Sequence, residues 1–172
     1  MEMLDALYDS PIKMIGVHDE RTGTHMADGF AQASERAGVV LAGQNGRGAT
    51  NLVTGLSQAK AAFSPVVSIA GMLAQGHIYC NAFQGVDQQA LFTPVTKKTW
   101  TVPNADRVPE LFREAFRTTL SPLQGPVQLN WPPKRILHRS KNQAVIAINL
   151  FQLLRILTLK RRPRCCLVRA SR

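Results

Sequence analysis

Glu20 stands where an apolar stretch, residues 12–17, gives way to a helical pattern. The next apolar stretch, residues 39–42, runs into a glycine-rich turn that ends at Asn51. In an open α/β sheet, ligands bind beyond the carboxyl ends of the parallel strands. A carboxylate at such a place can be partly desolvated and aimed at a cofactor. The pattern therefore indicates a functional carboxylate at Glu20, near a glycine-rich turn.

Each of these features also has an ordinary structural explanation. An acid in the position of Glu20 is typical of a helix N-terminus, where the helix dipole favours negative charge. The glycine turn is also typical of a tight turn whose Asn51 caps local backbone groups. A dinucleotide-binding fingerprint is disfavoured because Asn51 replaces its third glycine and no acid follows at the ribose-binding distance. A nucleotide-dependent oxidoreductase is therefore disfavoured. On these residues alone, Glu20 as an ordinary helix N-terminal acid and Asn51 as the cap of a tight turn both stay open.

The elements that position Glu20 and the turn alternate regularly along the chain. Apolar runs predict strands, and periodic apolar stripes predict helices between them. This alternation predicts an α/β fold with a doubly wound, mainly parallel sheet and helices on both faces, in three layers. We expect two apolar stripes to face the core, one of Met26, Phe30 and Ala33 and one containing Phe112 and Phe116. The predicted strands are 12–17, 39–42, 65–70, 95–102 and 126–130, and the predicted helices are 2–8, 20–36, 48–62, 87–92 and 105–120.

The net charge of +10 is unevenly distributed. Residues 1–133 hold ten of the 21 basic residues and all eleven acidic ones, whereas residues 134–172 hold the other eleven basic residues. We therefore expect a nearly neutral domain over 1–133 and a separate basic tail over 134–172. The tail is interpreted first as translation of a shifted reading frame. The alternatives are a nucleic-acid-binding tail, which would bind polyanions in a salt-sensitive way, and a helix on a membrane surface.

The remaining composition sets the expected compartment. Three cysteines at unsuitable spacings predict neither a disulfide framework nor a zinc site, so a reduced, cytoplasmic setting is expected. The acidic N-terminus lacks the features of a signal peptide. The longest apolar run, residues 144–159, is too short and too polar to predict a membrane span.

Six sequence blocks follow one another along the chain: His18-Asp-Glu20, Met26-Ala-Asp-Gly-Phe-Ala31, Gly43-Gln-Asn-Gly-Arg-Gly-Ala-Thr-Asn51, Ser64-Pro-Val-Val67, Phe83-Gln-Gly-Val-Asp-Gln88 and Gly125-Pro-Val-Gln-Leu-Asn130. Taken together and in this order, they resemble the N-terminal pyrimidine-binding domain of thiamine-diphosphate enzymes of the acetolactate synthase type. Within that type, the Gly-Gln-Asn-Gly, Phe-Gln-x-Val-Asp-Gln and Gln-Leu-Asn runs are most similar to sulfoacetaldehyde acetyltransferase. The resemblance covers about residues 3–132.

The resemblance implies a role for four residues. Glu20 would be catalytic: it would hydrogen-bond the ring nitrogen of the cofactor's aminopyrimidine and favour the tautomer whose exocyclic nitrogen removes the thiazolium proton. The protein would supply orientation and electrostatics while the cofactor carries the hard chemistry. Gly46, Asn51 and Gln84 would join Glu20 in binding the pyrimidine end of thiamine diphosphate. No residue of this chain is expected to bind the metal.

Four departures from the family limit these expectations. The chain begins after the family's first strand, so we expect an N-terminally incomplete domain. Arg47 replaces a proline and Gly85 replaces a glutamate of the family pattern. The sequence contains no Gly-Asp-Gly followed at the family's spacing by Asn, so magnesium and the diphosphate are expected to bind a domain that is missing here. The tail, finally, has no family resemblance.

These departures predict a truncated enzyme that is inactive as an isolated chain. The intact family enzyme is expected to be a homo-oligomer acting on a small carbonyl substrate. The competing hypothesis is a non-catalytic remnant α/β module whose basic tail binds nucleic acid.

Overall fold

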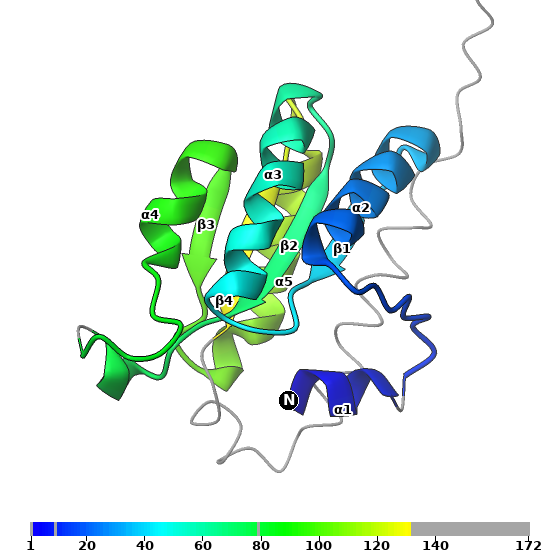
Figure 1. Ribbon diagram of the computed structural model, residues 1–172. Helices are drawn as coiled ribbons and strands as arrows, with labels where there is room; N and C mark the ends of the chain where they lie inside the picture. The colour runs from blue at the N-terminus through cyan, green and yellow to red at the C-terminus, as the bar shows by residue number, and fades with distance from the viewer. Residues whose placement is uncertain (1, 9, 79, 132–172) are drawn as a thin grey trace, which may run out of the picture.

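A computed structural model of the chain describes residues 2–8, 10–78 and 80–131 (Figure 1). Helices and strands alternate from residue 20 to residue 131, with three short 3-10 turns among them, and one further helix precedes this part. The helices are α1 (Glu2–Tyr8), α2 (Glu20–Ser34), α3 (Arg47–Ala61), α4 (Gln88–Phe92) and α5 (Val108–Leu120). The strands are β1 (Gly38–Leu41), β2 (Val66–Gly71), β3 (Lys98–Thr101) and β4 (Val127–Trp131), and the 3-10 turns are η1 (Gln75–His77), η2 (Thr93–Val95) and η3 (Ala105–Arg107).

The four strands form one parallel sheet in the order β1-β2-β4-β3. In its register, Val39 of β1 lies beside Val67 of β2, and Ile69 of β2 lies beside Leu129 of β4. Parallel neighbours need crossover connections, and each one here carries a helix. The chain passes through α4 to β3 and returns through α5, which places β4 between β2 and β3.

Helices cover both faces of the sheet (Figure 1). On one face, small and aliphatic side chains of α2 and α3 pack with Val66 and Ala70 of β2. On the other face, aromatic side chains of α5 pack with Val67 and Ile69 of the same strand. Successive β2 side chains thus divide between the two cores, as the pleat of a strand requires. The predicted α/β fold with a parallel sheet in three layers is confirmed.

Two glycines bring helix α2 close to its neighbours. A Cβ atom at Gly38 would lie 2.1 Å from the backbone oxygen of Ala27, inside helix α2. A Cβ atom at Gly55 of α3 would lie 2.6 Å from the Cβ of Thr24. No side chain fits at either distance, so the spacing of α2 from β1 and from α3 depends on both glycines.

The structure corrects two sequence-based expectations. Residues 12–17, predicted as a strand, are irregular and pair with no strand of the described sheet. A strand is stabilised by the hydrogen bonds of a neighbour, and this segment, largely exposed, has none there. The predicted stripe of Met26 and Phe30 is also wrong, because these side chains are 45% and 52% exposed. Thr24, Ala27, Asp28 and Ala31 are the buried residues of α2 instead.

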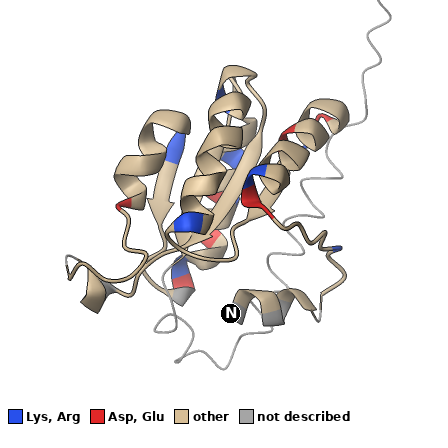
Figure 2. Ribbon diagram, in the orientation of Figure 1, with Lys and Arg blue, Asp and Glu red and all other residues tan. Residues whose placement is uncertain are grey.

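The tail predicted over residues 134–172 lies outside the described residues, and so does the end of the 1–133 domain. Figure 2 shows basic and acidic residues scattered over several helices of the described ribbon. Among the described residues, no helix is both long and apolar enough to cross a membrane.

Candidate active site

Glu20 is the first residue of α2 and lies near the carboxyl end of β1. Its Oε1 is 2.9 Å from the place that a Cβ atom would take at Gly48, and Ala42, just after β1, contacts the same place. The carboxylate is partly buried. Glu20 therefore lies near the carboxyl end of the sheet, although the strand predicted to lead into it, residues 12–17, is not formed.

Asn51 contacts Glu20 directly. The side-chain Nδ2 of Asn51, in the second turn of α3, donates a hydrogen bond of 3.1 Å to Oε2 of Glu20. The two residues are 31 positions apart in the sequence, and both are partly buried. The N-terminal parts of α2 and α3 thus hold one carboxylate between them.

Gly46 and Gln84 form a second contact next to the first. Gly46 precedes α3 with φ of 60° and ψ of −110°, a conformation open to glycine and strained for other residues. A Cβ atom there would lie 2.6 Å from the Cβ of Gln84, which is itself left-handed with φ of 64°. The side-chain amide of Gln84 reaches Oε1 of Gln44 at 3.4 Å. The glycine turn and the loop before α4 therefore pack against each other at this point.

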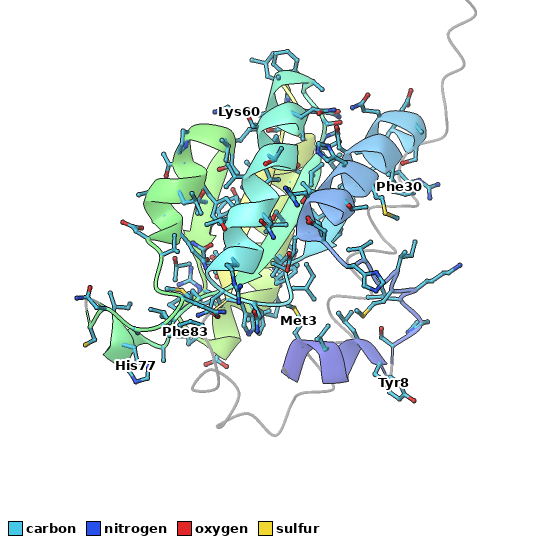
Figure 3. The ribbon with its side chains drawn as sticks, in the orientation of Figure 1. Met3, Tyr8, Phe30, Lys60, His77 and Phe83 are labelled. Carbon is cyan, nitrogen blue, oxygen red and sulfur yellow. The ribbon has the colours of Figure 1, made fainter. Side chains whose placement is uncertain are left out.

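The structure brings the four site residues predicted from the sequence into these two adjoining contacts. Glu20 bonds Asn51, Gly46 touches Gln84, and the start of α3 joins the pairs. Phe83, next to Gln84, is 84% exposed and lies at the surface (Figure 3). Gly48 was not predicted as a site residue, although its place as the second glycine of Gly46-Arg47-Gly48 could have indicated a close contact.

The start of α2 is fixed by Asp19. This N-cap residue accepts a hydrogen bond of 2.8 Å from the backbone N–H of Arg21 and pairs with the Arg21 guanidinium at 2.6 Å. These bonds, the side-chain bond to Arg21 foremost, lower the pKa of Asp19 from 3.8 to about 2. Because the cap sets where α2 begins, it also sets the position of Glu20.

Stability of the chain is expected to fall between about pH 4 and pH 2, partly through Asp19. The pKa of Asp19 is lower in the folded chain, so its stabilising contribution is present above pH 3.8 and is lost as pH falls towards 2. Urea unfolding at pH 5, 3 and 2 measures the loss, and Asp19→Asn is expected to make it smaller. Asp106→Asn, which changes another exposed acid, serves as the control. Equal acid sensitivity of wild type and Asp19→Asn would contradict this assignment.

Comparison with known proteins agrees with this geometry. Residues 1–91 match the family described as "Thiamine pyrophosphate enzyme, N-terminal TPP binding domain". The chain belongs to this family. Because the match covers more than half of the chain and includes Glu20, Gly46, Asn51 and Gln84, all four predicted site residues lie within the thiamine pyrophosphate enzyme domain.

Curated relatives of this thiamine pyrophosphate enzyme domain are acetolactate synthases. The chain is 42% identical over 128 residues to a probable acetolactate synthase large subunit of Methanocaldococcus jannaschii, covering 74% of this chain and 22% of the relative. It is 36% identical over 132 residues to acetolactate synthase isozyme 2 large subunit of Escherichia coli, covering 77% and 24%. A large subunit from Corynebacterium glutamicum is 34% identical over 148 residues, covering 78% and 24%. The chain thus spans about a quarter of the length of these relatives.

The residues at Glu20 fit the aminopyrimidine of thiamine pyrophosphate. Oε2 of Glu20 is taken by Asn51, whereas Oε1 has no hydrogen-bond donor in the part of the chain that the structure describes. A partly buried carboxylate with one free oxygen can accept a proton or a hydrogen bond from a ring nitrogen. The same described part contains no group of three or more His, Cys, Asp or Glu residues placed to hold a metal ion.

Proposed function

We propose that this chain is the pyrimidine-binding part of a thiamine-diphosphate-dependent enzyme of the acetolactate synthase type. The observation that carries the proposal is the Glu20 carboxylate, which lies at the sheet edge with one oxygen held by Asn51 and the other free of described donors. In this role Glu20 holds the proton at the pyrimidine ring nitrogen. Gly46, Asn51 and Gln84 shape the pyrimidine site around it, and their two contacts support this assignment.

When bound, the cofactor supplies the electron sink for chemistry at a carbonyl carbon. The residues of this chain orient its pyrimidine end and fix the charge around it. We assign the diphosphate and its magnesium to the domain that carries Gly-Asp-Gly in the family, a motif absent from this sequence. The proposed intact enzyme is a cytoplasmic homo-oligomer that acts on a small carbonyl substrate, and this chain alone is proposed to be inactive.

The finer proposal is sulfoacetaldehyde acetyltransferase. It is supported by the sequence runs around Gln44, Gln84 and Asn130, whereas the three relatives named above are all acetolactate synthases. In that reaction the enzyme releases sulfite from sulfoacetaldehyde and transfers an acetyl group to phosphate. Activity assays of a longer enzyme that contains this domain would decide between the two. Acetolactate synthase consumes pyruvate, whereas sulfoacetaldehyde acetyltransferase releases sulfite.

Glu20→Gln is expected to weaken binding of the aminopyrimidine about tenfold. The charged carboxylate makes a stronger hydrogen bond to a protonated ring nitrogen than an amide does. The measurement is an NMR titration of the whole chain with 4-amino-5-hydroxymethyl-2-methylpyrimidine, the pyrimidine end of the cofactor without its diphosphate. Glu35→Gln, at the exposed far end of α2, is the matched control and should bind as wild type does.

Two results would count against the proposal. Equal affinity of wild type and Glu20→Gln would remove Glu20 from the site. Micromolar binding of thiamine diphosphate with magnesium by this chain alone would contradict the assignment of the diphosphate to another domain.

A further inference from the structure

The side chain of Asn51 has one hydrogen-bond partner among the described residues, and that partner is Glu20. An asparagine this near a helix start could cap backbone groups, as the sequence suggested. In the described part of the chain, however, its amide caps none, and Gly46 caps α3 with its backbone alone. The amide is therefore committed to the carboxylate across the interface between α2 and α3.

Gly48 acts on the other oxygen of the same carboxylate. It lies in the first turn of α3 and is buried, and any Cβ atom there would approach Oε1 of Glu20 to 2.9 Å and Cδ to 3.5 Å. The missing side chain lets the carboxylate lie against the helix backbone. An added methyl group would push the carboxylate away from α3 and lengthen its bond to Asn51.

We infer that Asn51 and Gly48 are positioning residues for Glu20: the Asn51 amide fixes Oε2, and the bare Gly48 backbone leaves Oε1 free to receive the ring nitrogen. This inference rests on the proposed function, but it places Asn51 behind Glu20 instead of on the cofactor. Few water molecules compete for a hydrogen bond between a partly buried amide and a carboxylate, so this bond restricts the carboxylate to one orientation. Oε2 then bonds Asn51, and Oε1 can bond the ligand.

The first test uses the side-chain amide of Asn51 as a reporter in the whole chain, without any ligand. The NMR signals of this amide are expected to shift in Glu20→Gln, where the carboxylate acceptor becomes a neutral amide, and to stay in place in Glu35→Gln. The other charged groups on the adjoining turns are Asp19, which pairs with Arg21, and the exposed Arg47. Glu20→Gln leaves all three unchanged, so it shows whether the signal belongs to Glu20.

The second test measures binding of the same aminopyrimidine probe by three variants. Asn51→Leu keeps the approximate size of the side chain and removes the donor, and it is expected to weaken binding about 3- to 10-fold, the loss typical of one hydrogen bond. Gly48→Ala, which keeps the donor, is expected to weaken binding as well. Thr54→Ala, at an exposed position one turn beyond Asn51 on α3, is the control and should bind normally.

The outcomes separate this inference from the proposed function. Asn51 side-chain signals that are the same in wild type and Glu20→Gln would overturn the inference, as would wild-type binding by Asn51→Leu. If the probe binds neither wild type nor any variant, the proposed function fails and the amide signals alone decide the pairing. If Gly48→Ala does not fold, Asn51→Leu and the amide signals still decide it.

Discussion

Gly38→Ala is expected to lower the free energy of unfolding by about 3 kcal/mol, the upper range for forcing a methyl group into a packed site. The added Cβ atom would lie 2.1 Å from the backbone oxygen of Ala27 and 2.7 Å from its carbonyl carbon. Side chains can rotate away from a new methyl group, but a helix backbone cannot. Relief therefore requires α2 to move away from β1 as a unit, which opens the core around Ala27, Ala31 and Val40.

Urea unfolding of the whole chain measures this effect, and Gly29→Ala is its matched control. Gly29 lies on the exposed side of the same helix α2, and a Cβ atom there would meet nothing within 4 Å. Because alanine is a better helix former than glycine, that change is expected to stabilise the chain by about 0.5–1 kcal/mol. An unfolding midpoint that stays in place for Gly38→Ala would mean that α2 and β1 are farther apart than described.

Phe112→Ala is expected to lower the free energy of unfolding by about 3–5 kcal/mol. Phe112 is 2% exposed in the core between α5 and the sheet. Its ring meets the edge of Trp131 at a centroid separation of 6.5 Å and an interplanar angle of 71°, a favourable arrangement for two aromatic rings. Truncation would remove the packing and leave a cavity beneath β4.

The comparison variant is Phe30→Ala, which removes the same side chain from a position that is 52% exposed. We expect a change within about 0.5 kcal/mol at this surface position. Chemical denaturation of both variants gives the two values, and similar values would contradict the described burial of the two phenylalanines.

From residue 20 onward, the order of the elements could be predicted from the sequence because helical and strand patterns alternate in it, whereas the strand predicted over residues 12–17 is not formed. The ends of the elements were less predictable, since they depend on local contacts. Residues 95–102 were predicted as a strand, but β3 covers only Lys98–Thr101 because the 3-10 turn Thr93–Val95 precedes it. Residues 105–120 were predicted as a helix, but α5 begins only at Val108, after a 3-10 turn in which the Asn104 side chain accepts the N–H of Arg107.

The buried face of α2 could not be predicted from large apolar residues. Met26 and Phe30 have helical spacing, but helix α2 buries small residues such as Ala27 and Ala31 because it lies so close to β1 and α3. The glycines that permit this closeness lie on the partner elements. A pattern within one helix carries no information about how near its neighbour will come.

The candidate site was only partly predictable, because local sequence patterns do not reveal contacts between residues far apart in the chain. The glycine turn follows the strand β1, so its placement at the carboxyl end of the sheet could be expected from the sequence. Glu20 was expected there because a strand was predicted over residues 12–17, which are irregular, and it lies there through the contacts of α2 with α3 instead. The bond between Asn51 and Glu20 spans 31 residues, and no local pattern specifies it. The role of Gly48 depends on the same long-range contact, which explains why the sequence alone did not reveal it.

The contact between Gly55 and Thr24 has a consequence for how variants of this chain should be read. Gly55 lies one helical turn after Asn51, and Thr24 lies one turn after Glu20, so both pairs face each other across the same helix crossing. The close approach of the two helices at Gly55 and Thr24 therefore sets the distance between Glu20 and Asn51. In a random-mutagenesis screen scored by ligand binding, position 55 should register as if it were part of the site, although a side chain there would meet Thr24 and not the Glu20 carboxylate.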